Sequence, residues 1–182
     1  MKQNQKEQRV EQLVKQHVRD IPDFPKPGIV FKDITPLLSD PNVFRSIIEV
    51  FASRYKGEKL SAIVGIESRG FLFGAALAHS LGIAFVPIRK KGKLPYETIE
   101  VSYDLEYGSA VVEMHTDALC KGDRVVIIDD LLATGGTAEA ACKLVKKSGG
   151  HIHECAFVIE LAFLDGRKNI LDAASFAIAS YS

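Results

Sequence analysis

Apolar residues recur at helical spacing in four parts of the chain. The first part lies within residues 1–20, the second within 43–51, the third is FLFGAALAHSLG at 71–82, and the fourth runs from Ala138 to Val145. Residues three and four apart share one face of an α-helix, so each part is predicted to be helical. The third part is apolar at nearly every position, which predicts a helix buried on all sides.

Short apolar runs rich in β-branched residues lie between these helices. They are Ser61–Ile66, Ile83–Ile88, Val125–Ile128 and Cys155–Leu161. Runs of this length without alternation are typical of strands buried on both faces. Strands alternating with helices predict βαβ units, and hence an α/β fold with a mostly parallel sheet in a single domain over residues 1–182.

Two stretches depart from this alternation. Three prolines within residues 22–27 end the first helix and predict an irregular segment up to about residue 38. In the segment GKLPYETIEVSYDLEYGSAVVEMH, four apolar residues alternate with polar ones, which predicts a hairpin or flap with one half-buried face. These residues are Val101, Tyr103, Leu105 and Tyr107.

The charge balance limits the classes of partner. The 182 residues include 23 basic and 23 acidic side chains, so the formal net charge of zero offers no general attraction to nucleic acid or to a membrane surface. The first residues, MKQNQKEQRVEQ, lack the apolar core of a signal peptide, and we therefore expect a cytoplasmic protein. Three widely spaced cysteines, Cys120, Cys142 and Cys155, indicate reduced thiols, without a disulfide framework or a zinc site.

The stretch VVIIDDLLATGGT carries the clearest candidate chemistry. A strand that passes through a loop into a helix presents backbone N–H groups at the helix N-terminus, which favours an anion such as phosphate. The loop residues suited to phosphate are Thr134, Gly135, Gly136 and Thr137. Asp129 and Asp130 would repel a phosphate beside them, so they are expected to accept hydrogen bonds from hydroxyls. A phosphate at one end and a diol at the other describe a ribose 5-phosphate.

This stretch closely resembles the phosphoribosyl pyrophosphate (PRPP) motif of type I phosphoribosyltransferases. FPKPGIVFKDITPLL, GIESRGFLFG, RKKGKLP and SYDLEYG extend the resemblance over most of the chain, to members that act on adenine. The resemblance implies the type I fold, a mostly parallel twisted sheet flanked by helices, with an N-terminal helix and base-binding hood over residues 1–40 and a flexible flap over 90–115. It also implies a homodimer.

The implied reaction transfers the 5-phosphoribosyl group from PRPP to N9 of adenine, forming AMP and pyrophosphate. By resemblance, the loop from Ala133 to Thr137 holds the 5-phosphate, and Asp129 and Asp130 contact the ribose hydroxyls. Successive residues of a regular strand point to opposite faces, so both acids reach one diol only if the strand ends before them. The alternative is a strand that ends in a solvated acidic turn.

Two further loops are implied to bind pyrophosphate. In ESRG the contacts are Ser68 and Arg69, and this loop is expected to carry an unusual cis peptide. The fixed fork of donors on Arg69 matches phosphate oxygens. In RKKGK the contacts are Arg89 and Lys93, because this basic run also follows a strand end, where ligand crevices form in α/β sheets. The alternatives are an arginine in a surface salt bridge and a solvated basic run.

The remaining roles concern the base and its proton. By resemblance, Phe31 stacks on adenine while the main chain of Val30 and Lys32 reads its edge; the alternative for Phe31 is an ordinary core position. Glu106 is implied to handle the proton at purine N7, and Tyr107 to close the flap over C1 and exclude water. Without the resemblance, Glu106 would be assigned to the solvent-facing side of a strand.

Magnesium is expected as the cofactor, without a dedicated protein cage, because Mg²⁺ keeps waters and binds largely through substrate phosphates. Two other functions stay open. A PRPP-sensing regulator would need a nucleic-acid-binding element, but residues 1–20 hold only five basic and three acidic side chains. The same transfer to hypoxanthine or guanine is disfavoured by resemblance, through the FPKPGIVFKDI segment.

Overall fold

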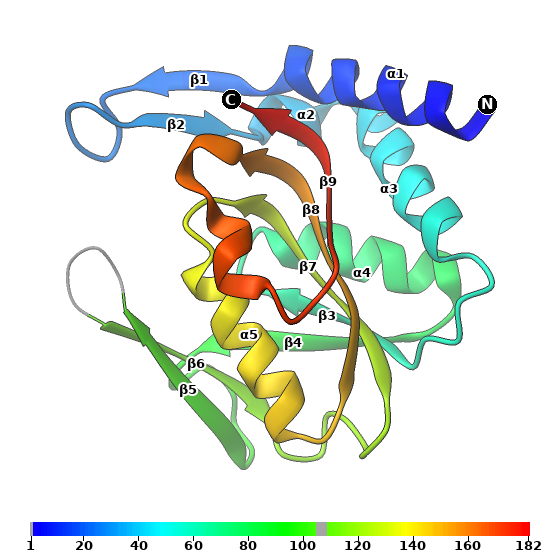
Figure 1. Ribbon diagram of the computed structural model, residues 1–182, viewed down its shortest axis with the longest axis vertical. Coiled ribbons are helices and arrows are strands. Elements are labelled where there is room, and N and C mark those ends of the chain that lie inside the picture. The colour runs from blue at the N-terminus through cyan, green and yellow to red at the C-terminus, as the bar shows by residue number, and fades with distance from the viewer. Residues whose placement is uncertain (1, 105–108) are drawn as a thin grey trace. The chain divides into compact units, whose positions relative to one another are not determined.

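A seven-stranded sheet forms the centre of the larger part of the chain (Figure 1). The computed structural model describes residues 2–104 and 109–182, and in these the sheet has the order β5-β6-β4-β3-β7-β8-β9. Its strands are β3 (Ala62–Ile66), β4 (Ala84–Lys90), β5 (Thr98–Asp104), β6 (Ser109–His115), β7 (Arg124–Leu132), β8 (His151–Leu161) and β9 (Ser175–Tyr181).

The five strands β4, β3, β7, β8 and β9 are mutually parallel, whereas β6 joins β4, and β5 joins β6, in antiparallel fashion. The expected mostly parallel sheet is therefore confirmed. The antiparallel pairing of β5 with β6 matches the predicted hairpin, and along β5 Val101 is buried while Ser102 is exposed. β9 was not predicted, because its apolar residues are interrupted by serine and carry no clear period.

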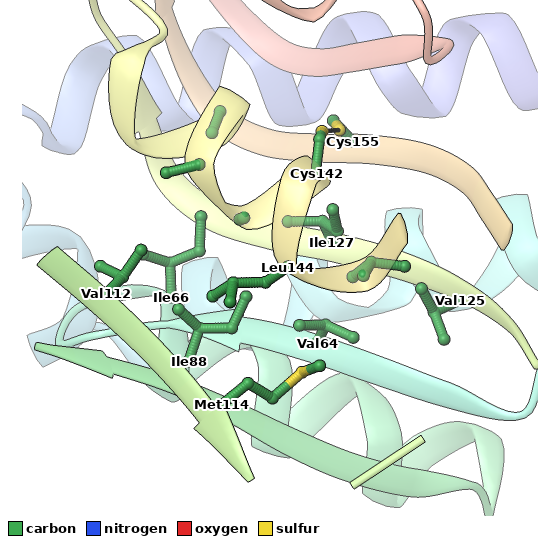
Figure 2. Packing of buried hydrophobic residues seen from close by; sticks show 14 of the residues in the cluster. Val64, Ile66, Ile88, Val112, Met114, Val125, Ile127, Cys142, Leu144 and Cys155 are labelled. Atoms are coloured by element: carbon green, nitrogen blue, oxygen red, sulfur yellow. Dashed lines mark hydrogen bonds between the residues drawn. The ribbon is translucent and has the colours of Figure 1, made fainter. Parts of the chain in front are cut away.

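Helices cover both faces of this sheet. Leu144 of α5 (Gly136–Lys147) belongs to a buried cluster with Val64, Ile66 and Ile127 (Figure 2). On α4 (Gly70–Leu81), a Cβ added to Gly74 would lie 2.9 Å from Cγ2 of Ile128. Successive residues of a strand point to opposite faces, so α5 and α4 pack on opposite faces of β7.

The prediction that the apolar helix at 71–82 is buried on all sides is wrong. Phe73 and Leu77 of α4 are fully buried, but Leu72 is 46% exposed and Ala75 is also exposed. A helix that lies on one face of a sheet buries only the stripe that meets the strands, whatever its composition.

The chain divides into two compact units, residues 1–54 and 55–182. The first contains α1 (Lys2–His17), β1 (Arg19–Pro22), β2 (Val30–Asp33), α2 (Thr35–Ser39) and most of α3 (Pro41–Tyr55). α1 and α3 agree with the predicted periodicity, whereas α2 was not predicted. The proline-rich stretch is not wholly irregular, because β1, which ends at Pro22, pairs antiparallel with β2 across a turn that contains Pro25 and Pro27. That residues 1–182 act as one domain stays a prediction.

After β8, two short 3₁₀ helices, η1 (Ala162–Leu164) and η2 (Gly166–Ile170), lead to β9. The sequence analysis did not identify this segment. None of the helices in the described ranges is long and apolar enough to cross a membrane.

Candidate active site

The strand that carries the two acids continues past them. β7 pairs with β3 only as far as Ile128, but it pairs with β8 as far as Leu132. The condition that the strand ends before Asp129 is therefore wrong, as is the alternative of a solvated acidic turn. β3 is shorter than β8, so the segment of β7 that carries the two acids pairs with β8 but not with β3.

Both carboxylates nevertheless adjoin the same loop, the one between β3 and α4. Asp130 Oδ2 lies 2.9 Å from Arg69 Nε, and a Cβ added to Gly70 would lie 2.9 Å from Asp129 Oδ1. Asp129 Oδ1 also accepts the backbone N–H of Asp130, at 2.9 Å, which turns this carboxylate back along its own strand. A glycine at position 70 is what allows the loop to approach so closely.

The two acids are held in an environment that opposes their ionisation. Burial raises the pKa of Asp129 well above its ordinary value, and the neighbouring charge of Asp130 adds to this rise. Burial also raises the pKa of Asp130, while the Arg69 guanidinium opposes the rise. Within the described residues, the buried Asp130 Oδ2 accepts no well-aligned hydrogen bond despite the nearby Arg69. A ligand hydroxyl would supply this missing donor.

The loop after β7 encloses a small cavity. Asp129 and residues 131–138 line about 90 Å³, which is enough for a phosphate group and much less than a complete nucleotide site. The cavity lies against the first turn of α5, whose N-cap residue, Gly135, supplies no side-chain hydrogen bond. First-turn N–H groups have no acceptor inside a helix, so they are available to an anion in this cavity.

The η2 segment packs against this loop, a contact that the sequence analysis did not predict. Gly135 has φ +88°, and a Cβ added to it would overlap the carbonyl oxygen of Gly166. A Cβ added to Gly166 would in turn overlap the carbonyl oxygen of Ala133. Asn169 Nδ2 donates a 2.7 Å hydrogen bond to the carbonyl oxygen of Thr134. The η2 segment therefore fixes the shape of the loop from its outer side.

The η2 segment is itself fastened to the sheet. Arg167 donates two hydrogen bonds of 2.6 Å, from Nε and Nη2, to the two carboxylate oxygens of Glu160, which is buried at the end of β8. This pairing raises the pKa of Arg167. Such a planar, two-point contact restricts direction as well as distance. In the sequence, Asp165-Gly166 indicates a turn, but nothing nearby identifies the loop that the turn supports.

The loop that joins β3 to α4 has the expected cis peptide, between Glu67 and Ser68. Ser68 is exposed and Arg69 is partly buried. Glu67 was not among the predicted residues, yet its Oε2 accepts hydrogen bonds from Arg89 Nε at 3.2 Å and from the backbone N–H of Lys90 at 3.0 Å. Partial burial alone would raise the pKa of Glu67, but these two donors lower it.

The basic run after β4 is held by a second carboxylate. Oε1 of the buried Glu113 accepts the backbone N–H groups of Lys93 and Leu94, each at 2.9 Å. Arg89 Nη1 donates to the carbonyl oxygen of Lys93 at 3.2 Å. Lys91, by contrast, pairs with Glu100 at 2.8 Å. Arg89 is therefore joined to the ESRG loop through Glu67, whereas the basic run as a whole does not converge on one point.

In the N-terminal unit, the predicted base-binding residues lie on β2. Phe31 is half-buried and meets Phe24 edge to face, with ring centroids 5.2 Å apart, so it is not a fully buried core residue. Val30 is 49% exposed, and Lys32 pairs with Asp20 at 2.7 Å. In the part of the chain that the structure describes, β2 pairs only with β1, so alternate backbone groups of β2 point away from that ladder.

Glu106 and Tyr107 lie outside the described residues, and their predicted roles stay predictions. The strands β5 and β6 that flank them carry no other residue of the predicted site.

Comparisons with known proteins agree with this geometry. Residues 33–174 match the family model described as phosphoribosyl transferase domain. An adenine phosphoribosyltransferase of Roseiflexus sp. (strain RS-1) is 57% identical over 164 residues, which are 90% of this chain and 95% of that protein.

Two solved structures show the same similarity. The adenine phosphoribosyltransferase of Thermoanaerobacter pseudethanolicus is 50% identical with a TM-score of 0.90, over 93% of this chain and 99% of that one. The enzyme of Saccharomyces cerevisiae, complexed with an iminoaltritol bisphosphate and adenine, is 42% identical with a TM-score of 0.90, over 94% of this chain and 99% of that one. The chain described here belongs to the adenine phosphoribosyltransferase family of type I phosphoribosyltransferases.

Proposed function

We propose that this enzyme transfers the 5-phosphoribosyl group of PRPP to N9 of adenine, with AMP and pyrophosphate as products. The observation that carries the proposal is the cavity that Asp129 lines together with the first turn of α5. It combines an acceptor for hydroxyls with donors for a phosphate, the two requirements of a ribose 5-phosphate.

The 5-phosphate binds in this cavity, to the backbone N–H groups and hydroxyls of residues 133–137. The ribose hydroxyls donate to Asp129 and Asp130. Hydrogen bonds from those hydroxyls to the carboxylates favour the ionised acids, which burial disfavours in the ligand-free enzyme. Binding is therefore expected to lower the pKa of both acids and to release protons.

Pyrophosphate is assigned to the loops with Ser68, Arg69, Arg89 and Lys93. Arg69 and Arg89 each contact an acid through Nε, at 2.9 Å to Asp130 and 3.2 Å to Glu67. A guanidinium carries five N–H donors in a fixed fork, so contacts with protein acceptors orient the group, and the fork matches the geometry of phosphate oxygens. The ion pair between Arg69 and Asp130 supports a pyrophosphate site adjacent to the ribose site.

Mg²⁺ fits this donor set as a partner of the substrate. Among residues 5–103 and 109–182 no group of three or more histidine, cysteine, aspartate or glutamate side chains is arranged to hold a metal ion. Asp129 and Asp130 are hard oxygen donors that would approach the ion through the ribose hydroxyls or bound waters. When bound, Mg²⁺ neutralises charge on the departing pyrophosphate.

Adenine is assigned to the N-terminal unit, where Phe31 stacks on the ring and the main chain of Val30 and Lys32 reads its edge. The half-buried state of Phe31 supports this assignment, because a ring that is partly exposed is available to a planar ligand. Glu106 exchanges the proton at purine N7, and Tyr107 excludes water from C1. A cytoplasmic location and a homodimer also stay predictions, the second of which light scattering would test.

The test of the proposed function is AMP formation from PRPP and adenine, run beside hypoxanthine, guanine and a reaction without metal. Metal-dependent turnover with adenine alone is the expected result. Tight PRPP binding without turnover on any purine would favour a regulator instead, and turnover with a 6-oxopurine would overturn the assignment of the base.

Asp130→Asn is expected to weaken PRPP and AMP binding by roughly 10- to 100-fold, because a hydrogen bond to a charged group contributes about 1.5–3 kcal/mol. Isothermal titration with each ligand measures the loss. The exposed Asp117→Asn is the matched control, since it removes a carboxylate outside the site. Unchanged affinity in Asp130→Asn would refute the diol assignment.

The same variant tests the pKa argument on the ligand-free protein. The folded-state pKa of Asp130 lies above its ordinary value of 3.8, so ionisation of this group lowers stability as the pH rises from that value to the raised one. Asparagine removes this ionisation. The melting temperature of Asp130→Asn relative to the wild type is therefore expected to increase from pH 4 to pH 7. A relative decrease over this range would contradict the raised pKa.

Asn169→Ala is expected to raise KM for PRPP by about 3- to 10-fold without changing kcat, because it removes one neutral hydrogen bond to the phosphate loop. Steady-state kinetics with PRPP varied give the measurement. Lys168→Ala is the control, since Lys168 lies on the same segment but pairs with Asp165. A fall in kcat with an unchanged KM would show that Asn169 does not act through phosphate binding.

A further inference from the structure

Two buried cysteines lie in contact between α5 and β8. The sulfur atoms of Cys142 and Cys155 are 3.5 Å apart (Figure 2). Cys142 is 6% exposed and Cys155 is fully buried, whereas Cys120, the third cysteine, is exposed and lies outside this pair. A disulfide has an S–S length of about 2.05 Å, so the two sulfur atoms would have to close by about 1.5 Å.

One residue of the pair, Cys142, lines a cavity that the proposed transfer reaction does not use. This cavity of about 260 Å³ lies between the outer side of α5 and the segment after η1, and Cys142 forms part of its wall. Three lysines, Lys143, Lys146 and Lys168, also line it, with Glu139 and Asp172 as the acids. Cys155 does not line the cavity. A small neutral oxidant that enters here meets Cys142 first.

The two thiols also differ in acidity. The two thiols share one S–H···S contact in which either sulfur can be the donor. A hydrogen bond from Cys155 lowers the pKa of Cys142, with a further contribution from Lys146, while burial opposes the change. The same hydrogen bond raises the pKa of Cys155, as does burial. Since the thiolate is the nucleophile, Cys142 is the more reactive of the two.

We propose that Cys142 and Cys155 form a peroxide-oxidisable pair, in which Cys142 reacts first and Cys155 resolves the product as an internal disulfide. In the first step the Cys142 thiolate attacks H₂O₂, an S–O bond forms, the O–O bond breaks and hydroxide leaves, giving a sulfenic acid. In the second step the Cys155 sulfur attacks that sulfur, an S–S bond forms, the S–O bond breaks, and water leaves with the Cys155 proton. Two thiols are oxidised and one peroxide is reduced to two waters.

This disulfide would join the second turn of α5 to β8. The first turn of α5 carries the proposed phosphate loop, so the link would restrict the helix that holds that loop. Formation of this disulfide can be measured without a phosphoribosyl transfer reaction. Failure of this proposal and failure of the proposed function can therefore be told apart.

The test treats the folded full-length protein with hydrogen peroxide, alkylates it in denaturant and digests it with trypsin. The expected result is loss of two alkylatable thiols per chain and a disulfide-linked pair of peptides, residues 125–143 and 148–167, which dithiothreitol separates. Cys120→Ser is the matched control and should form the same linked pair.

Two variants test the oxidation of Cys142 and the formation of the disulfide separately. In Cys155→Ser, Cys142 is expected to stop as a sulfenic acid that dimedone traps. In Cys142→Ser, Cys155 is expected to remain alkylatable, because it has no access to the cavity. If peroxide modifies only Cys120, or takes Cys142 to a sulfinic acid in the wild type without a disulfide, the proposal is overturned.

Discussion

Gly135→Ala is expected to lower kcat/KM for PRPP by about 100-fold or more. The substitution combines two effects, a side chain at φ +88° and a Cβ that overlaps the carbonyl oxygen of Gly166. The overlap is with backbone, which cannot rotate away as a side chain can, so the phosphate loop must move. A displacement of about 1 Å at a binding site costs on the order of 100-fold in rate.

The chain offers a control that separates the two effects. Gly82, which caps α4, also has a positive φ of +67°, but a Cβ added there has no atom within 4 Å. Gly82→Ala is expected to lose about 1 kcal/mol of stability and to keep its affinity for PRPP. In Gly166→Ala the added Cβ would overlap the carbonyl oxygen of Ala133 in the phosphate loop, so this variant is expected to behave like Gly135→Ala. Steady-state kinetics with circular dichroism measure activity and fold together, and normal PRPP kinetics in Gly135→Ala would contradict the close contact.

Glu106→Leu is expected to lower kcat by roughly 100- to 10,000-fold, the usual range for loss of a general acid or base, with PRPP affinity nearly unchanged. Adenine becomes a better leaving group when N7 is protonated, and in the forward direction the new bond at N9 makes N7 acidic. A carboxylate at N7 serves both directions, while leucine serves neither. Single-turnover rates and PRPP titration measure the two quantities separately.

Two comparisons make this prediction specific. Glu106→Gln keeps the shape and hydrogen-bonding ability of the side chain but cannot exchange a proton, so it should be nearly as slow as the leucine variant. Glu97→Leu, at an exposed position before β5, should retain full activity. Equal losses of turnover and PRPP affinity in Glu106→Leu would overturn the assigned role, and an active Glu106→Gln would show that Glu106 acts through shape or hydrogen bonding and not through proton exchange.

Local pattern was enough to locate most elements and the centre of the site. The run Val125–Ile128 and the spacing from Ala138 to Val145 predicted strand, loop and helix, and all three are present as β7, the loop and α5. Both predictions depend on residues close together in the chain, where the spacing of apolar residues follows the period of a helix or a strand. The small residues of the loop led to the prediction of a phosphate site, because glycines allow close backbone approach to a ligand.

Other expectations failed where the outcome depended on distant partners. The run 71–82 has the composition of a fully buried helix, yet Leu72 is exposed because α4 meets the sheet on one side only. Asp129 and Asp130 looked like the end of a strand, but β7 continues because β8 is long enough to pair with it. In each case a neighbouring element decided the result, and sequence periodicity contains no information about the length or position of that neighbour.

The sequence by itself determined which residue types the candidate site holds: glycines and threonines where α5 begins, two adjacent acids in β7, and arginines at positions 69 and 89. The roles assigned to these residues stay predictions. The tertiary structure alone decided how these groups are held. It set Arg69 against Asp130, Arg89 against Glu67, and Gly166 against Gly135. The physical reason is that the chemical groups of a site follow from residue type, which can be read directly from the sequence. Their orientation depends on contacts between residues separated by 22 to 61 positions, which exist only once the chain has folded.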